Sequence, residues 1–201
     1  MRVVVLVSGR GSNLRAIAEA IDAGRCAAEI VGVVADRRRC DALAFAEARG
    51  VPTASVRPKD YADRDAWDVA LADAVSGFEP ALVVLAGFMK IVGASMLSRF
   101  DGRIVNVHPS LLPAFPGMGA PQQAIDAGVC VTGCTVHLVD AGVDTGRVLA
   151  QVAVRVRPDD DAGSLHARIQ RLEHELLPRV VDALAKGEDP RWLGSAGLRS
   201  P

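Results

Sequence analysis

Short apolar runs alternate with segments of helical periodicity along the first half of the chain. Runs of β-branched and aliphatic residues predict five strands, at residues 2–7, 29–35, 53–56, 81–86 and 103–107. Apolar residues at helical spacing predict three intervening helices, at residues 14–21, 40–49 and 60–75. Because strands that alternate with helices build parallel sheets, this half predicts βαβ units joined by right-handed crossovers.

The second half of the chain carries a different pattern. Two alternating runs, residues 132–140 and 147–156, predict a pair of antiparallel strands. Helical spacing predicts a short helix over residues 121–127 and a long one over residues 161–186. Together the two halves predict an α/β fold, a doubly wound and mostly parallel Rossmann-like sheet with antiparallel edge strands in the C-terminal half.

Two polar side chains emerge where the strand at residues 103–107 ends. Asn106 and His108 are two positions apart, so they point to one side of the strand about 6 to 7 Å from each other. Pro109 biases His108 toward an extended backbone, and prolines 113 and 116 stiffen the chain beyond it. Taken alone, this tetrapeptide is more typical of a satisfied turn than of a functional site.

The position of this turn in the predicted sheet favours a site. Ligands of doubly wound sheets bind beyond the carboxyl ends of the strands, near the point where the strand order reverses. Three segments begin at such ends, residues 9–13, 87–92 and 106–109. We therefore expect them to contribute to one crevice.

The first of these segments, residues 9–13, is a glycine-rich turn between a strand and a helix. This arrangement directs backbone N–H groups and the positive end of a helix dipole at an anion. Ser12 or Asn13 would also serve as an N-cap, which is the purely structural interpretation. Since Leu14 stands where a dinucleotide fingerprint has its third glycine, the turn favours a single phosphate monoester.

Other polar residues allow both a structural and a functional interpretation. In the loop of residues 140–146, Asp140 and Asp144 are either turn acids that bond their own backbone or members of a site. His137 lies mid-strand and favours a packed histidine. Arg64, near a helix start, is typical of solvated surface. So is a polar face of the last helix formed by His166, Gln170, Glu173 and His174.

Composition and charge narrow the classes of partner. The 201 residues are 50% hydrophobic and 23% charged, as in a globular protein with a buried core. The net charge of −1, with both signs interspersed, argues against nucleic acid or a membrane as partner. The apolar run at residues 3–7 is too short for a signal peptide, which predicts a cytoplasmic protein. The four cysteines lack metal-ligand spacing and predict free thiols.

Several motifs in order resemble the folate-dependent formyltransferase family, and within it the glycinamide ribonucleotide formyltransferases of purine biosynthesis. The motifs are SGRGSNL at residues 8–14, LAGFMKI at 85–91, NVHPSLLPAFPG at 106–117, TGCTVHLVDAGVDTG at 132–146 and QRLEH at 170–174. The resemblance runs from residue 2 to about residue 186. It implies formyl transfer from 10-formyltetrahydrofolate, as a cosubstrate, to the amine of glycinamide ribonucleotide, without a metal.

The resemblance also implies roles for three groups of residues. The catalytic group would be Asn106, His108 and Asp144. The ribonucleotide would be held by Gly11, Ser12, Asn13, Gln170 and Glu173. The formyl donor would be held by Arg64, Met89, Lys90, Ile91, Val92, Asp140 and Gly142. One position departs from the family pattern, which usually has a histidine where this chain has Gly119.

The expected organisation is one formyltransferase domain over residues 1–187, with a phosphate-binding half at 1–100 and a catalytic and folate-binding half at 101–187. Residues 188–201 have turn formers without periodicity and predict a loosely ordered tail. We expect a monomer or a homodimer. Two alternatives stay open: a formyl-folate hydrolase or a formyltransferase for another amine, and a non-catalytic nucleotide-binding module.

Overall fold

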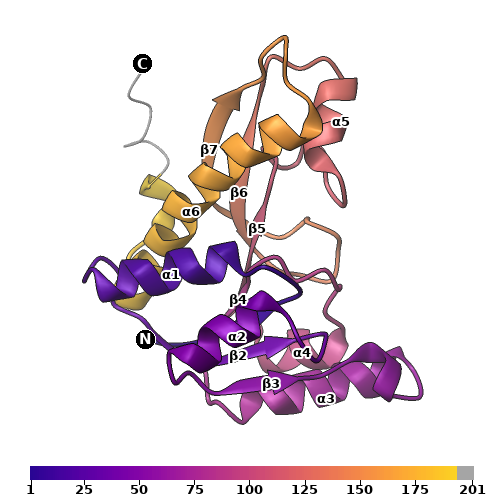
Figure 1. Ribbon diagram of the computed structural model, residues 1–201, viewed down its shortest axis with the longest axis vertical. Helices are drawn as coiled ribbons and strands as arrows, with labels where there is room; N and C mark the ends of the chain where they lie inside the picture. Colours follow the sequence, from indigo (N-terminus) through magenta and orange to yellow (C-terminus); the bar gives the residue numbers. More distant parts are fainter. Residues whose placement is uncertain (194–201) are drawn as a thin grey trace. The chain divides into compact units, whose positions relative to one another are not determined.

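The computed structural model of the chain describes residues 1–193, which group into two units (Figure 1). The first unit comprises residues 1–106, and the second begins at residue 107. The division falls within strand β5 (Ile104–His108).

The first unit is built on five parallel strands. They are β1 (Arg2–Val7), β2 (Glu29–Ala35), β3 (Thr53–Ser55), β4 (Leu82–Leu85) and β5. Their order is β3-β2-β1-β4-β5, so the strand order reverses between β1 and β4. Val5 at the centre of β1 pairs with Val33 of β2 and with Val84 of β4. In a doubly wound sheet, such a reversal predicts a ligand crevice beyond the carboxyl ends of the two strands, here β1 and β4.

Helices cover both faces of this sheet. They are α1 (Ser12–Asp22), α2 (Asp41–Ala48), α3 (Arg64–Ser76) and α4 (Ala94–Arg99). The strands progress one way from β1 to β3 and the other way from β4 to β5, so right-handed crossovers put α1 and α2 on one face and α3 and α4 on the other. In agreement, α1 packs against α2 and α3 packs against α4 (Figure 1).

The apolar core of the first unit follows the pattern of the sequence. All five residues from Val3 to Val7 are fully buried, as expected of a central strand covered on both faces. Trp67 of α3 is also fully buried, and its indole Nε1–H donates to the carbonyl of Val56 at 2.9 Å.

The second unit is a hairpin covered by a long helix. Strands β6 (Val131–Leu138) and β7 (Val148–Arg155) pair antiparallel. Helix α6 (Ala162–Lys186) packs on both strands and on α5 (Ala120–Asp126). Asp161 and Ser164 form a capping box at the start of α6. The predicted α/β fold, mostly parallel with antiparallel strands in the C-terminal half, is confirmed.

Three helices differ from the prediction in ways that have a clear physical reason. Helix α1 is capped by Gly11 and not by Ser12 or Asn13. Helix α3 begins at Arg64, because the Asp63 side chain caps it by accepting from Ala66 N at 2.8 Å. Helix α4 was not predicted, since its six residues are too few to show a helical period.

Two further expectations concern the chain end and membranes. Of the tail expected from residue 188, Pro190–Trp192 form a 3₁₀ turn, and residues 194–201 lie outside the described part of the structure. Within residues 1–193, every helix is too short or too polar to cross a bilayer.

Gly133 provides a stability test of the β6–β7 hairpin. A Cβ added there would lie 2.0 Å from the carbonyl oxygen of Val152 on the facing strand. We expect Gly133→Ala to lower the free energy of unfolding by about 2 to 3 kcal/mol or more, measured by urea denaturation. Gly77→Ala is the control, because its Cβ would meet Ala74 O at an ordinary 3.6 Å. Equal stability of Gly133→Ala and the wild type would contradict the close packing of the two strands.

Candidate functional site

Strand β5 carries the two polar residues singled out in the sequence. Asn106 pairs in register with Leu85 of β4 and is partly exposed. His108, the last residue of the strand, is buried, with 5% of its surface exposed. Because the two positions alternate with Val107, their side chains leave the same face of β5.

The imidazole of His108 has an acceptor beside each ring nitrogen. Nδ1 lies 3.3 Å from Oδ2 of Asp144, and Nε2 lies 2.8 Å from the carbonyl oxygen of Phe115. A neutral ring has one N–H and can donate to only one of them, whereas a protonated ring donates to both. The structure thus brings together His108 and Asp144, two of the three residues expected in the catalytic group.

Asp144 also reaches a second buried imidazole. Its Oδ1 lies 3.5 Å from Nε2 of His137, which is 2% exposed and whose Nδ1 faces the carbonyl of Leu138 at 2.8 Å. The burial expected of His137 is confirmed, but its contact with Asp144 was missed. The sequence analysis left open whether Asp144 is a turn acid or a member of a site, and it did not indicate which side chains Asp144 would reach.

The environment of Asp144 favours its ionised form. Burial on its own raises the pKa of this carboxyl. The hydrogen bond with His137, the N–H of Gly117 at 2.8 Å and the charge of His108 outweigh burial, so the pKa lies below its ordinary value. Asp144 therefore presents a negative charge to His108 at neutral pH.

The two acidic side chains of the 140–146 loop make different contacts. Oδ1 of Asp140 accepts from the N–H of Gly142 at 3.0 Å and from the hydroxyl of Thr145 at 2.7 Å, so Asp140 shapes its own loop. Gly146 lies so close to β6 that an added Cβ would sit 1.8 Å from the carbonyl oxygen of Leu138. Asp144, with φ at 56°, is thereby turned away from the loop and toward the histidines.

A buried polar network fixes the segment that follows His108. The Thr135 hydroxyl donates to the carbonyl of Ser110 at 2.7 Å and accepts from the N–H of Leu112 at 3.0 Å. The side-chain amide of Gln151 donates to Thr135 Oγ1 at 2.9 Å and to the carbonyl of Leu112 at 2.8 Å. Side chains from β6 and β7 thus hold this segment, a role that was not predicted from the sequence.

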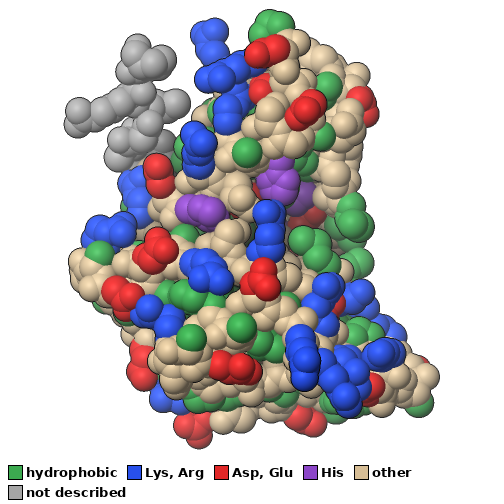
Figure 2. Space-filling model, viewed as in Figure 1, with side chains coloured by type: hydrophobic (Ala, Val, Ile, Leu, Met, Phe, Trp, Pro, Cys, Tyr) green, Lys and Arg blue, Asp and Glu red, His purple; other side chains and the backbone are tan. Residues whose placement is uncertain are grey.

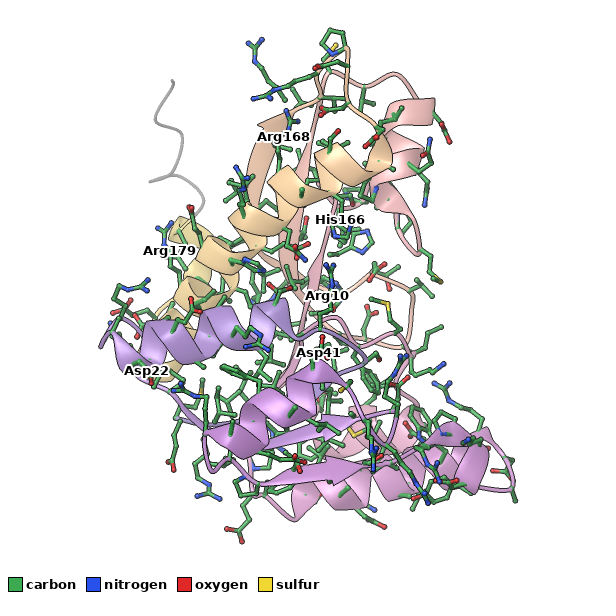
Figure 3. The ribbon with its side chains drawn as sticks, viewed as in Figure 1. Arg10, Asp22, Asp41, His166, Arg168 and Arg179 are labelled. Carbon is green, nitrogen blue, oxygen red and sulfur yellow. The ribbon has the colours of Figure 1, made fainter. Side chains whose placement is uncertain are left out.

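The glycine-rich turn of the first unit depends on one glycine. Gly11 has φ at 73°, and a Cβ there would lie 2.6 Å from Cβ of Ala42, so only glycine fits. Lacking a side chain, Gly11 gives α1 no side-chain cap. Ser12 and Asn13 form the first turn of α1, and Figure 3 labels Arg10 just before it. As in any α-helix, the first N–H groups of α1 have no acceptor within the helix.

The segment after β4, also in the first unit, holds the residues expected at the formyl donor. Met89 and Ile91 are 64% and 61% exposed, whereas Val92 is buried. The N–H of Met89 donates to the Ser8 hydroxyl at 2.8 Å. Lys90 Nζ lies 4.0 Å from a carboxylate oxygen of Asp36, which the sequence analysis did not single out.

Arg64 is placed by an aromatic side chain. Its guanidinium lies 4.5 Å from the ring centroid of Trp67, one turn further along α3. Figure 2 shows acidic and basic side chains interspersed over much of the visible face, with a group of Lys and Arg side chains near the start of α3. Arg64 is thus stacked on its own helix and not only solvated.

The polar face of α6 was predicted to be solvent-exposed, but the structure buries part of it. Glu173 is 4% exposed, and Gln170 is partly buried. The buried Glu173 also affects Cys134 of β6. Burial of the thiol is the main reason that the pKa of Cys134 is raised to about 12, and the negative charge of Glu173 is the second. His166 and Arg168 extend from opposite sides of α6 (Figure 3), and Arg168 pairs with Asp160 at 2.9 Å.

Gly119 is the position that departs from the pattern that the resemblance implies. This glycine, where the resemblance implies a histidine, caps α5 with φ at 74°, a backbone conformation that suits glycine. An added Cβ would meet open space there.

Across residues 1–193, no three His, Cys, Asp or Glu side chains are grouped so as to hold a metal ion.

Comparison with known proteins gives consistent matches over nearly the whole chain. Residues 1–181 match the family model described as formyl transferase. A phosphoribosylglycinamide formyltransferase of Mycobacterium tuberculosis (strain H37Rv) is 52% identical over 184 residues, covering 92% of this chain and 85% of the relative. A trifunctional purine biosynthetic protein of Drosophila melanogaster is 42% identical over 188 residues, covering 92% of this chain and 14% of that protein.

Solved structures agree with these matches. The crystal structure of glycinamide ribonucleotide transformylase 1 from Symbiobacterium toebii has a TM-score of 0.91 at 43% identity. The match covers 93% of this chain and 88% of that chain.

The lowered pKa of Asp144 leads to a prediction about acid stability. Its folded pKa lies below the ordinary value, so the unfolded chain binds the proton first as the pH falls. The ionised carboxylate therefore stabilises the fold above an unfolded pKa of about 3.9, and this contribution is lost as the pH falls through the folded pKa. We expect the difference in unfolding free energy between the wild type and Asp144→Asn to shrink from about pH 5 to about pH 2 in urea titrations. A difference independent of pH over this window would contradict the assignment.

Proposed function

The chain belongs to the formyl transferase family, and on that premise we propose that it transfers the formyl group of 10-formyltetrahydrofolate to the amine of glycinamide ribonucleotide in purine biosynthesis. The observation that carries the proposal is the carboxylate of Asp144 against the buried imidazole of His108, on the strand that also carries Asn106. We expect the enzyme to work in the cytoplasm, as a monomer or a homodimer.

Formyl transfer makes two chemical demands on the protein. The amine attacks the formyl carbon, a C–N bond forms, and negative charge develops on the formyl oxygen. The attacking nitrogen must then lose a proton, and the leaving nitrogen of the folate must gain one as its bond to carbon breaks. A suitable site has hydrogen-bond donors at the oxygen and a group that can pass a proton.

Asn106 and His108 match the first demand. The Asn106 amide donates a hydrogen bond to the developing oxyanion, and a protonated His108 donates a stronger, charge-assisted one. Since Nδ1 of His108 faces Asp144, Nε2 is the nitrogen that donates to the substrate, which replaces the Phe115 carbonyl as its acceptor. By analogy with other oxyanion donors, Asn106 contributes on the order of 10² to 10³ in turnover, about 3 to 4 kcal/mol.

Asp144 serves the second demand. Its negative charge stabilises and orients the imidazolium, which then passes its proton to the departing folate nitrogen. A water molecule beside the carboxylate takes the proton of the attacking amine. His137 and the N–H of Gly117 hold the carboxylate in place through this exchange. This mechanism assigns no step to a metal.

The two substrates are proposed to occupy the segments identified above. The N–H groups at Gly11, Ser12 and Asn13 bind the single phosphate of the ribonucleotide at the start of α1, with Gln170 and Glu173 of α6 binding the same substrate. The donor is held by Arg64, by the backbone of Met89, Lys90, Ile91 and Val92, and by the loop that contains Asp140 and Gly142. Because the Asp140 carboxylate is used within that loop, it acts by shaping the loop.

One assay tests the reaction. We expect a change in folate absorbance when 10-formyltetrahydrofolate and the protein are mixed with glycinamide ribonucleotide, and no change without the ribonucleotide. Turnover without the ribonucleotide would identify a formyl-folate hydrolase. Turnover only with a different amine would identify another transferase, and no turnover would favour a nucleotide-binding module.

The Asp144→Asn variant tests the mechanism. We expect its turnover to fall on the order of 10³-fold, because the imidazole loses its negative partner and its orientation. Ribonucleotide affinity should stay nearly unchanged, because Asp144 acts on the chemical step. Asp126→Asn is the control, since this exposed carboxylate of α5 accepts from Gln122 outside the proposed site. A near-normal rate for Asp144→Asn, measured alongside ribonucleotide titration, would remove Asp144 from the mechanism.

A further inference from the structure

The segment of residues 87–93, which joins β4 to α4, is anchored at both ends and exposed in the middle. At one end, the N-H of Met89 donates to the Ser8 hydroxyl, and Phe88 stacks on Trp67 with ring centroids 6.4 Å apart. The exposed middle includes the side chains of Met89 and Ile91. At the other end, Gly93 caps helix α4 and contacts Asp68.

Asp68 is a buried carboxylate with three backbone donors. Oδ1 accepts from the N–H of Gly93 at 2.5 Å, and Oδ2 accepts from the N–H groups of Ser95 at 2.8 Å and Met96 at 3.2 Å. Only 2% of the residue is exposed. A buried carboxylate is costly unless it is hydrogen-bonded, and here the donors are the end of the segment and the first turn of α4.

The fit between Asp68 and the segment leaves no spare room. A Cβ added to Gly93 would lie 2.6 Å from Cγ of Asp68. The backbone of Gly93, with φ at −100°, suits any residue, so it is the nearness of the carboxylate that requires glycine. The contact therefore fixes the distance between α3 and the end of the segment.

Helix α3 joins this anchor to two other parts of the proposed donor site. It carries Arg64, which stacks on Trp67, and Trp67 in turn stacks on Phe88 of the segment. Asp68 follows Trp67 directly in the sequence. One helix thus presents a proposed donor-binding arginine and holds the proposed donor-binding segment at two points.

We infer that Asp68 is a positioning residue for the formyl donor, holding the carboxyl end of residues 87–93 so that the backbone at Met89–Val92 meets the folate. The inference rests on the proposed function. Binding groups must be held to within a fraction of an ångström, and a displacement of about 1 Å far from the chemistry can cost on the order of 10²-fold in rate. The proposed chemistry does not use Asp68 directly, so its effect is on donor affinity.

The test is the isosteric variant Asp68→Asn. Its amide has one acceptor oxygen, and its NH₂ group faces N–H donors, so the variant cannot serve both Gly93 and the first turn of α4. We expect the Kd for tetrahydrofolate and the KM for 10-formyltetrahydrofolate to rise about tenfold. The KM for glycinamide ribonucleotide should stay nearly unchanged. Amide hydrogen exchange at Gly93, Ser95 and Met96 should become faster.

Two further variants separate positioning from loss of stability. Val75→Ala, two turns along the same helix, removes buried methyl groups and destabilises the fold while the Asp68 carboxylate is kept. It should leave the donor KM unchanged. Gly93→Ala pushes on the carboxylate from the opposite side and should raise the donor KM as Asp68→Asn does. Because both act on one contact, their effects in the double variant should be less than additive.

The outcomes distinguish this inference from the proposed function. A wild-type protein that binds no tetrahydrofolate overturns the proposed function, and with it the donor role. A wild-type protein that turns over normally while Asp68→Asn keeps the wild-type donor KM overturns the positioning role alone. An equal rise in the KM of both substrates, or a rise in the donor KM for Val75→Ala of the same size, also overturns it.

Discussion

The carboxylate of Asp144 lies between two buried imidazoles, and the chemistry proposed for the chain depends on this interaction. Its two oxygens face His108 and His137 at 3.3 and 3.5 Å, and the N–H of Gly117 adds a third contact. Removing either the charge or the donors would leave buried polar groups without compensation. Each of these contacts therefore offsets the free-energy cost of burying the group on its other side.

The backbone around Asp144 and His108 positions these side chains as much as their own contacts do. The close approach of Gly146 to β6 brings the 140–146 loop back toward the strand, and Asp140 closes the loop from within. On the other side, Thr135 and Gln151 hold the chain after His108. In the proposed reaction these contacts supply preorganisation, because donors held in place need not reorganise as charge develops.

Much of the fold followed from periodicity alone, since apolar runs and helical spacing are strong signals in long elements. The central strand β1 was predicted to the residue, whereas α4, six residues long, left no period to detect. The residue types at Asn106 and His108 indicated a site because they sit at the end of a strand. The contacts of Asp144 with His108 and Gly117, and the donors to Asp68, join residues 25 or more positions apart, which spacing does not encode. The proposed role of Asp144 came from the resemblance to a family, whereas its contact with His137 was found only in the structure.

The thiols of the second unit differ sharply in reactivity. Cys134 lies inside β6, and burial beside Glu173 raises its pKa to about 12, so it stays a neutral thiol at any pH a cell reaches. Cys130, just before the same strand, is exposed. Because the thiolate is the nucleophile, electrophilic reagents and oxidants will discriminate between these two neighbours. The hairpin thus carries its own selective attachment point for a spectroscopic label, one residue ahead of the strand that bears His137.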